Sequence, residues 1–323
     1  MSVRIAALAG GVGAGKFLRG LVRVVPPEDV TVIVNTGDDI FLHGLHVSPD
    51  LDSVTYWLAG VSDRERGWGR AGETFRATEE LRRLRAEGAW FGLGDLDLAT
   101  HLFRSALLSQ GATLAEATAE VARRFGIGTR ILPMANGPVA TRVDAVAETG
   151  QAVDLHFQEY WVKREAKDEV KGIRYEGAAA AIPAPGVLDA LAEAEVVVIC
   201  PSNPIASIDP ILAIPEMERT VRARRDRVVG VSPIVGGAPV RGMADRLLPV
   251  AGVDVSAAGV AGYYAGRGLI GSWVIDRVDA RQASAARALG LRVAITDTMM
   301  VDDDAAERVA RVALELALRG GLA

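Results

Sequence analysis

The stretch VRIAALAGGVGAGKFLRGL, residues 3–21, decides the fold and indicates the first binding site. Val3 to Leu8 is a short apolar run bounded by glycine, which predicts a buried strand. Four glycines and Lys16 follow, and apolar residues then recur at helical spacing. The order of strand, glycine loop and helix leaves unpaired backbone N–H groups at the start of the helix, where a phosphate can bind.

The glycine loop fits two known phosphate-binding patterns only in part. Gly10 to Lys16 matches the G-x-x-x-x-G-K half of a P-loop, but Phe17 stands where Ser or Thr would hold Mg²⁺. The dinucleotide pattern fails because Lys16 takes the place of the third glycine. A tight turn without a ligand is the alternative. We predict a phosphate site, with any metal held by acids elsewhere, on Gly10, Gly11, Gly13 and Lys16.

Composition excludes several classes of protein. Half of the 323 residues are hydrophobic, which suffices for a large core, and the net charge of −5 without a long basic run argues against a nucleic-acid partner. The single cysteine, Cys200, excludes a disulfide framework or a thiolate metal cluster. Without a signal pattern or an apolar run of membrane-spanning length, we expect a cytoplasmic protein that does not contact a membrane.

Strands and helices alternate along most of the chain. Apolar, β-branched runs predict further buried strands at Val30–Val34, Trp90–Leu93, Val196–Ile199, Val228–Val231, Trp273–Ile275 and Arg292–Ile295. The intervening segments have helical periodicity. Thr113 and Glu116 have the spacing of a capping box at the start of one helix.

The pattern changes between about residues 131 and 180. Thr141–Ala147 and Ala152–Val162 alternate apolar and polar residues around a turn at Gly150. This predicts an antiparallel hairpin inserted in an otherwise parallel fold. We therefore predict one α/β domain over residues 1–323, a doubly wound, mostly parallel, Rossmann-like sheet with this antiparallel insertion.

Polar residues follow the predicted strands. Besides the glycine loop, these are Asp38 and Asp39, Asp95 and Asp97, Ser202 and Asn203, and Ser232. Ligands of open α/β sheets bind beyond the carboxyl ends of the strands, so we expect these loops to converge on one site. The Pro201–Pro204 turn suits a phosphate, a ribose or a base edge, with a purely structural turn as the alternative.

Four acids between residues 38 and 52 form the strongest signal for a metal. Asp52 could instead cap the helix that begins near Val54, and aspartates often cap turns. Several carboxylates beside a phosphate site repel one another unless a cation lies between them. Mg²⁺ takes one or two protein carboxylates together with phosphate oxygens and water. We predict that Asp38 and Asp52, one from each loop, hold it.

Together these segments resemble the CofD/FbiA-type 2-phospho-L-lactate (or phosphoenolpyruvate) transferase family of deazaflavin coenzyme biosynthesis. The resemblance runs from Leu8 to Asp245 and rests on AGGVGAGKFLRGL, VNTGDDIFLHGLHVSPDLDSVTYWLAG, WFGLGDLDLATH, HFQEYWV, PSNPIASI and VSPIVGGAPVRGMAD. The long second segment is the specific one.

The resemblance implies a Mg²⁺-dependent transfer. A donor in which guanosine diphosphate is esterified to lactate or enolpyruvate would react with 7,8-didemethyl-8-hydroxy-5-deazariboflavin, releasing GMP and giving coenzyme F-420-0 or its dehydro form. Asp38, Asp52 and Asp50 would be catalytic, Asp50 as a proton acceptor. The donor would bind the glycine loop with Ser202, Asn203 and Ser232. The deazaflavin would contact Asp52, Gly92, Leu93, Asp95 and His101.

One departure and one rival function qualify the resemblance. Leu96 stands between the two acids of LGD-x-D, where the family usually has arginine, so a charged contact to the acceptor or to a neighbouring acid is missing. The rival is a non-catalytic nucleotide-sugar-binding regulatory protein of similar fold, which would have little need of a metal. The family also implies a homodimer, for which the apolar stripe at 157–162 is a candidate contact.

Overall fold

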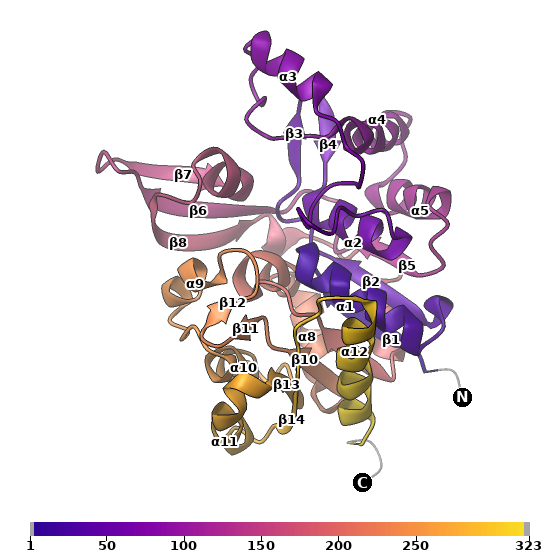
Figure 1. The fold of residues 1–323 in the computed structure, drawn as a ribbon, viewed down its shortest axis with the longest axis vertical. Coiled ribbons are helices and arrows are strands. Elements are labelled where there is room, and N and C mark those ends of the chain that lie inside the picture. Colours follow the sequence, from indigo (N-terminus) through magenta and orange to yellow (C-terminus); the bar gives the residue numbers. More distant parts are fainter. Residues whose placement is uncertain (1–2, 320–323) are drawn as a thin grey trace.

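A seven-stranded parallel sheet forms the centre of the computed structural model, which describes residues 3–319 (Figure 1). Its strand order is β14-β13-β10-β9-β1-β2-β5. The strands are β1 Ile5–Ala9, β2 Val30–Val34, β5 Arg130–Pro133, β9 Val196–Ile199, β10 Val228–Val231, β13 Ser272–Asp276 and β14 Arg292–Thr296. The chain progresses in one direction from β1 through β2 to β5 and in the other from β9 onwards, so the order reverses between β1 and β9. This is the doubly wound order expected from the sequence.

Strand β1 is buried along its whole length, because helices cover both faces of the sheet. Ala6 and Leu8 belong to one hydrophobic core, and Ile5, Ala7 and Ala9 belong to the other. Successive side chains of a strand point to opposite faces, so β1 contributes to both cores. Helices α1 Gly11–Val24, α2 Pro49–Ala59, α5 Leu114–Arg124 and α12 Asp303–Leu318 supply the second core. The first core contains residues of α6 Val187–Glu193, α8 Pro215–Ala223, α10 Ala257–Gly266 and α11 Ala283–Ala288.

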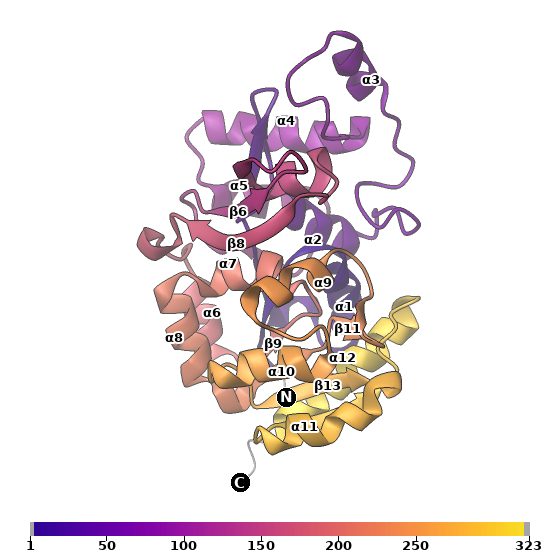
Figure 2. The same cartoon turned by 90° about the vertical axis from the view of Figure 1, so that its left-hand side faces the viewer.

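The predicted antiparallel insertion is confirmed and contains a third strand. β6 Ala140–Val146 lies between β7 Ala152–His156 and β8 Glu169–Glu176, and a short π-helix at Glu159–Lys163 follows β7. Figure 1 shows this sheet projecting from the main body, and in Figure 2 it faces the viewer. Its lower boundary differs from the prediction, because Arg130–Pro133 is β5, the edge strand of the main sheet. Phe157 and Tyr160 of the proposed dimer stripe are buried in the core.

A second excursion follows β2 and carries most of the predicted acids. It comprises the hairpin β3 Ile40–Leu42 and β4 Leu45–Val47, helix α2, α3 Arg76–Arg83 and α4 Asp95–Ser109. Two predictions are wrong here. Trp90–Leu93 is a turn followed by irregular chain, and its apolar side chains pack against the hairpin instead of joining the sheet. Helix α2 begins at Pro49 after the N-cap Ser48, so Asp52 lies inside the helix and does not cap it.

Short elements complete the fold between β9 and β13. They are a π-helix at Pro204–Ile208, α7 Asp209–Leu212, β11 Ile234–Val235, β12 Ala238–Pro239 and α9 Ala244–Leu247. Over the described residues, none of the helices has the length and apolar character required to cross a membrane.

Candidate active site

The glycine loop lies at the switch point of the sheet, between the ends of β1 and β9. Helix α1 begins at Gly11 after the N-cap Gly10. The Gly10 N–H donates to Ser202 Oγ at 3.3 Å. A Cβ on Gly13 would lie only 2.1 Å from the Pro201 carbonyl oxygen, so the loop after β9 packs directly on the glycine backbone. The structure thus brings Gly10, Gly13 and Ser202 together at the amino end of a 14-residue helix.

Asp50 and Asp38 lie together beside this loop. A Cβ on Gly10 would lie 2.3 Å from Asp50 Oδ2, and one on Gly11 would lie 3.3 Å from Asp50 Oδ1. The side-chain amide of Asn35 donates to Asp50 Oδ2 at 2.9 Å and to Asp38 Oδ1 at 3.4 Å. Gln158, from the insertion, donates to Asp38 Oδ2 at 2.8 Å. Two buried carboxylates therefore share one amide donor next to the glycine loop.

Burial shifts the titration of both carboxylates. It raises the pKa of Asp50 to about 7, although hydrogen bonds from Asn35 and Ser207 oppose the shift. Burial also raises the pKa of Asp38 well above its usual range, and the negative charges of Asp50 and Asp39 add to this effect. Adjacent buried carboxylates are unfavourable unless a proton or a cation neutralises them. Their oxygens match the ligands that Mg²⁺ prefers, so Asp38 and Asp50 fit a magnesium site.

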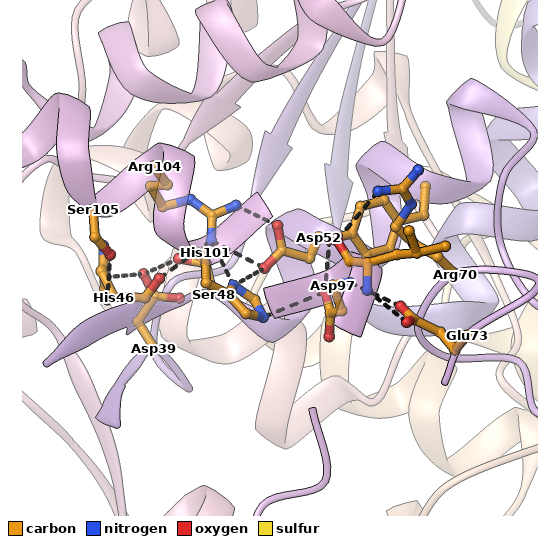
Figure 3. Close-up of polar contacts among 12 residues, drawn as sticks. Asp39, His46, Ser48, Asp52, Arg70, Glu73, Asp97, His101, Arg104 and Ser105 are labelled. Carbon is orange, nitrogen blue, oxygen red and sulfur yellow. Dashed lines mark hydrogen bonds and ion pairs between the residues drawn. The ribbon is translucent and has the colours of Figure 1, made fainter. Parts of the chain in front are cut away.

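Asp52 belongs to a different set of contacts, between α2 and α4 (Figure 3). The Arg104 guanidinium binds both of its carboxylate oxygens, with Nη1 3.0 Å from Oδ2, and His101 Nδ1 lies 3.4 Å from Oδ2. His101 Nε2 is 3.3 Å from Asp97 Oδ1, which also accepts a 2.6 Å hydrogen bond from the Tyr56 hydroxyl. All five side chains are buried. These residues form the Arg104 network.

The structure therefore does not bring the predicted metal pair Asp38 and Asp52 together through any contact among the described residues. Residues two apart in a helix point about 200° from each other, so Asp50 faces the glycine loop while Asp52 faces α4. Ligand atoms of Asp52, Asp97 and His101 lie within 4.8 Å of one another, a spacing that could suit a metal. The Arg104 guanidinium already supplies positive charge there, which leaves less need for a cation.

The other residues predicted to bind the donor nucleotide differ in how far their polar atoms already contact other parts of the protein. Asn203 caps the π-helix that follows it, accepting from the Ile205 N–H at 3.0 Å, and Ser232 Oγ bonds within its own turn. Lys16 Nζ lies 5.8 Å from the centre of the Trp57 ring. Burial lowers the pKa of Lys16, and the nearby positive charges of two arginines contribute.

Most of the residues predicted to contact the deazaflavin are buried or hydrogen-bonded within the protein. Leu93 and His101 are buried, 3% and 1% exposed, and Gly92 is half-buried. Asp95 accepts backbone hydrogen bonds from Arg76 and Ala77 at the start of α3. Of the predicted acceptor residues, only Gly92 and Asp95 keep partial exposure.

Sequence reasoning missed three residues that organise the site. Asn35 joins Asp38 to Asp50, Gln158 binds Asp38 from a distant segment, and Arg104 holds Asp52. Asn35 gave a usable signal, since it directly follows β2. Gln158 lies in the segment HFQEYWV that supports the resemblance, but neither Gln158 nor Arg104 could be linked to its partner, because the partners lie 120 and 52 residues away in the chain.

Comparison with known proteins gives a consistent result. Residues 5–315 match the family described as 2-phospho-L-lactate transferase CofD. The phosphoenolpyruvate transferase of Streptomyces griseus is 49% identical over 315 residues, covering 98% of each chain. The enzyme of the same name from Mycolicibacterium smegmatis is 38% identical, covering 98% of this chain and 99% of its own.

A solved structure supports the fold alone. The crystal structure of a UPF0052 family protein from Bacillus halodurans superposes with a TM-score of 0.63 at 17% identity, covering 97% of this chain and 99% of its own. The family match and the curated relatives extend over nearly the whole chain, including the glycine loop and both carboxylate segments. The chain therefore belongs to the 2-phospho-L-lactate transferase CofD family and is a transferase.

Proposed function

We propose that this enzyme transfers a phosphoenolpyruvyl or 2-phospholactyl group from a guanosine-diphosphate-linked donor to 7,8-didemethyl-8-hydroxy-5-deazariboflavin in coenzyme F-420 biosynthesis. Family membership supports the reaction class, and relatives of 49% identity are named phosphoenolpyruvate transferase. The observation that carries the proposal is the pair Asp38 and Asp50 beside the glycine loop. A diphosphate and a divalent cation can meet there.

The glycine loop binds the diphosphate of the donor in this proposal. Backbone N–H groups at the start of α1 point to the phosphate oxygens, and the helix dipole favours negative charge. Gly10 and Gly13 let Asp50 and Pro201 pack directly on this loop, because a side chain at either position would collide with them. Ser202 borders the same loop through its hydrogen bond to Gly10.

Asp38 and Asp50 would hold Mg²⁺ over this loop. When bound, the ion neutralises charge on the transferring phosphoryl group and orients its oxygens. Asn35 and Gln158 keep the two carboxylates in place by donating one hydrogen bond to each. This assignment replaces Asp52 by Asp50 as the second ligand. It needs no separate base, because phosphoryl transfer depends mainly on positioning and electrostatic stabilisation.

The acceptor would bind on the side of the β3–β4 hairpin. The hairpin leaves the Asp38–Asp39 turn directly, and Leu42 and Val47 pack with Leu93. Trp90 and Phe91 lie against this cluster and are only partly buried. Their rings meet edge to face at 83°, so one ring face would stack on a deazaflavin while the other ring contacts its edge. The terminal ribityl hydroxyl would attack the distal phosphorus of the donor, and GMP would leave.

The direct test incubates the purified protein with Mg²⁺, the deazaflavin and each guanylylated donor. We expect GMP release together with a mass gain of the acceptor equal to the transferred group, and loss of both signals with excess EDTA. GMP release without a change in the acceptor would indicate hydrolysis, and no turnover with either donor would contradict the proposal.

A further inference from the structure

Helix α1 begins between an acidic and a basic group of side chains. Asp50 and Asp38 lie beside Gly10 and Gly11, as described above. Lys16 follows Gly11 by five residues, which places it about 140° further around the helix. Side chains of a helix lean towards its amino end. The Lys16 ammonium lies 5.8 Å from the centre of the Trp57 ring, on a different face of α1 from the one that Asp50 contacts.

Two arginines from distant segments approach Lys16. Arg64, in the loop after α2, lines a small solvent-open pocket with Lys16, Trp57 and residues 300–303 at the start of α12. Arg241, in the loop after β12, donates a hydrogen bond to the carbonyl oxygen of Arg66 in the same loop as Arg64. Both arginines are exposed, and their charges contribute to the lowered pKa of Lys16 that burial causes. We call Lys16, Arg64 and Arg241 the basic cluster.

The acids nearest to the basic cluster are already engaged. Asp303 binds Arg64 at 3.0 Å and Arg19 at 3.3 Å, and Asp302 caps α12 by accepting from the Ala305 N–H at 2.7 Å. Within residues 3–319, neither Lys16 nor Arg241 has a carboxylate within 4.0 Å. Arg64 is therefore paired with Asp303, and the unbalanced charge is that of Lys16 and Arg241. Unpaired cations near each other are electrostatically unfavourable, and an anion placed between them lowers that cost.

The donor has one anionic group that the proposed site does not yet neutralise. Its phosphates meet the α1 amides and the Asp38–Asp50 side, but its lactyl or enolpyruvyl carboxylate would be repelled by Asp38, Asp39 and Asp50. We propose that Lys16 and Arg241, with Arg64 beside them, bind this carboxylate. The inference rests on the proposed function and assigns the acidic end of the donor to the basic cluster. In this assignment Lys16 binds the carboxylate of the donor, and the diphosphate is bound mainly by the backbone amides of the glycine loop.

Paired binding measurements test this assignment without turnover. The full-length protein is titrated, with Mg²⁺ and without acceptor, with guanosine diphosphate and with the same nucleotide esterified to enolpyruvate. The comparison uses Lys16→Met, Arg241→Met and the conservative Lys16→Arg. Arg222→Met is the matched control, an exposed arginine of α8 paired with Glu218. Melting temperatures show that every variant is folded.

We expect Lys16→Met and Arg241→Met each to weaken binding of the esterified donor about tenfold, the loss of one charge-assisted hydrogen bond. Affinity for guanosine diphosphate, which lacks the carboxylate, should stay within about twofold, and Lys16→Arg should retain most donor binding. Equal weakening of both ligands would overturn the assignment and place the diphosphate on the basic cluster. Unchanged binding of both would also overturn it. Failure of the proposed function is separate, because it appears as absent GMP release by the wild-type protein.

Discussion

Asp50 and Asp52 show how strongly the neighbours of a residue determine its role. Both are acids of the first helical turn of α2, yet Asp50 contacts the glycine loop and Asp52 is held by Arg104. Burial raises the pKa of Asp50 to about 7. We therefore propose Asp50 as a ligand of the metal and assign a structural role to Asp52.

Asp50→Asn should abolish transfer but stabilise the metal-free protein at alkaline pH. The folded-state pKa of about 7 exceeds the unfolded value, so the wild type loses stability as pH rises towards and through 7, when the buried carboxylate ionises. Asparagine lacks this charge. Both proteins are compared in EDTA. We expect the melting temperature of Asp50→Asn to exceed that of the wild type by more at pH 8 than at pH 6. Transfer should fall at least about 100-fold. Equal pH dependence of both proteins would contradict the burial of this charge.

The affinity for Mg²⁺ should decrease below pH 7. Metal binding needs ionised carboxylates, and burial raises the pKa of Asp50 to about 7 and that of Asp38 above its usual range. Affinity measured by calorimetry should fall about tenfold per pH unit where one proton is displaced, and more steeply where both acids are protonated. The pH range from about 5.5 to about 8 brackets the raised pKa of Asp50. An affinity for Mg²⁺ that stays constant over this range would show that these groups do not bind the ion.

Gly13→Ala should weaken donor binding by separating the two loops at the switch point. The added Cβ would lie 2.1 Å from the Pro201 carbonyl oxygen, a backbone atom that cannot rotate away. We expect a loss of about 1–3 kcal/mol in the free energy of unfolding, measured by urea denaturation, and weaker binding of guanosine diphosphate. Gly266→Ala is the control, since its Cβ would meet no atom within 4 Å. A Gly13→Ala variant with wild-type stability and binding would contradict the close packing of the loops.

At the scale of elements, the buried Arg104 network fixes α4 against α2. Arg104→Met would leave the Asp52 carboxylate buried without its partner, which should cost about 3–5 kcal/mol of unfolding free energy. The double variant Asp52→Asn, Arg104→Met should lose less than the sum of the single variants, because neither charge remains. Arg123→Met, which removes an exposed ion pair to Glu120, should be neutral. Additive single effects would show that Arg104 and Asp52 are not coupled.

Local sequence patterns predicted those elements that are stabilised by contacts between residues close together in the chain. The capping box at Thr113 and Glu116 is confirmed, because both of its hydrogen bonds join residues three apart. The predicted strand at Trp90–Leu93 is wrong, because a short apolar run can pack on a hairpin as well as in a sheet. Its true environment depends on Leu42 and Val47, which the run itself does not specify.

At the scale of the whole molecule, the parallel sheet determines where the site lies. Alternating strands and helices predicted the edge at which the glycine loop and the Pro201–Asn203 turn meet. The pairing of Asp38 with Asp50 could not be predicted, because it depends on the direction of side chains around α2 and on Gln158 from the insertion. Sequence thus narrowed the candidate site to a few loops, and tertiary packing determined which of its carboxylates lie together.

The most direct test of the central claim is to locate the metal in a crystal grown with Mn²⁺ and guanosine diphosphate, using anomalous scattering. The account predicts one Mn²⁺ bound to Asp38 and Asp50, with the diphosphate on the amides of the loop that begins at Gly10. A metal bound instead by Asp52, Asp97 and His101, or a diphosphate bound away from the glycine loop, would contradict it.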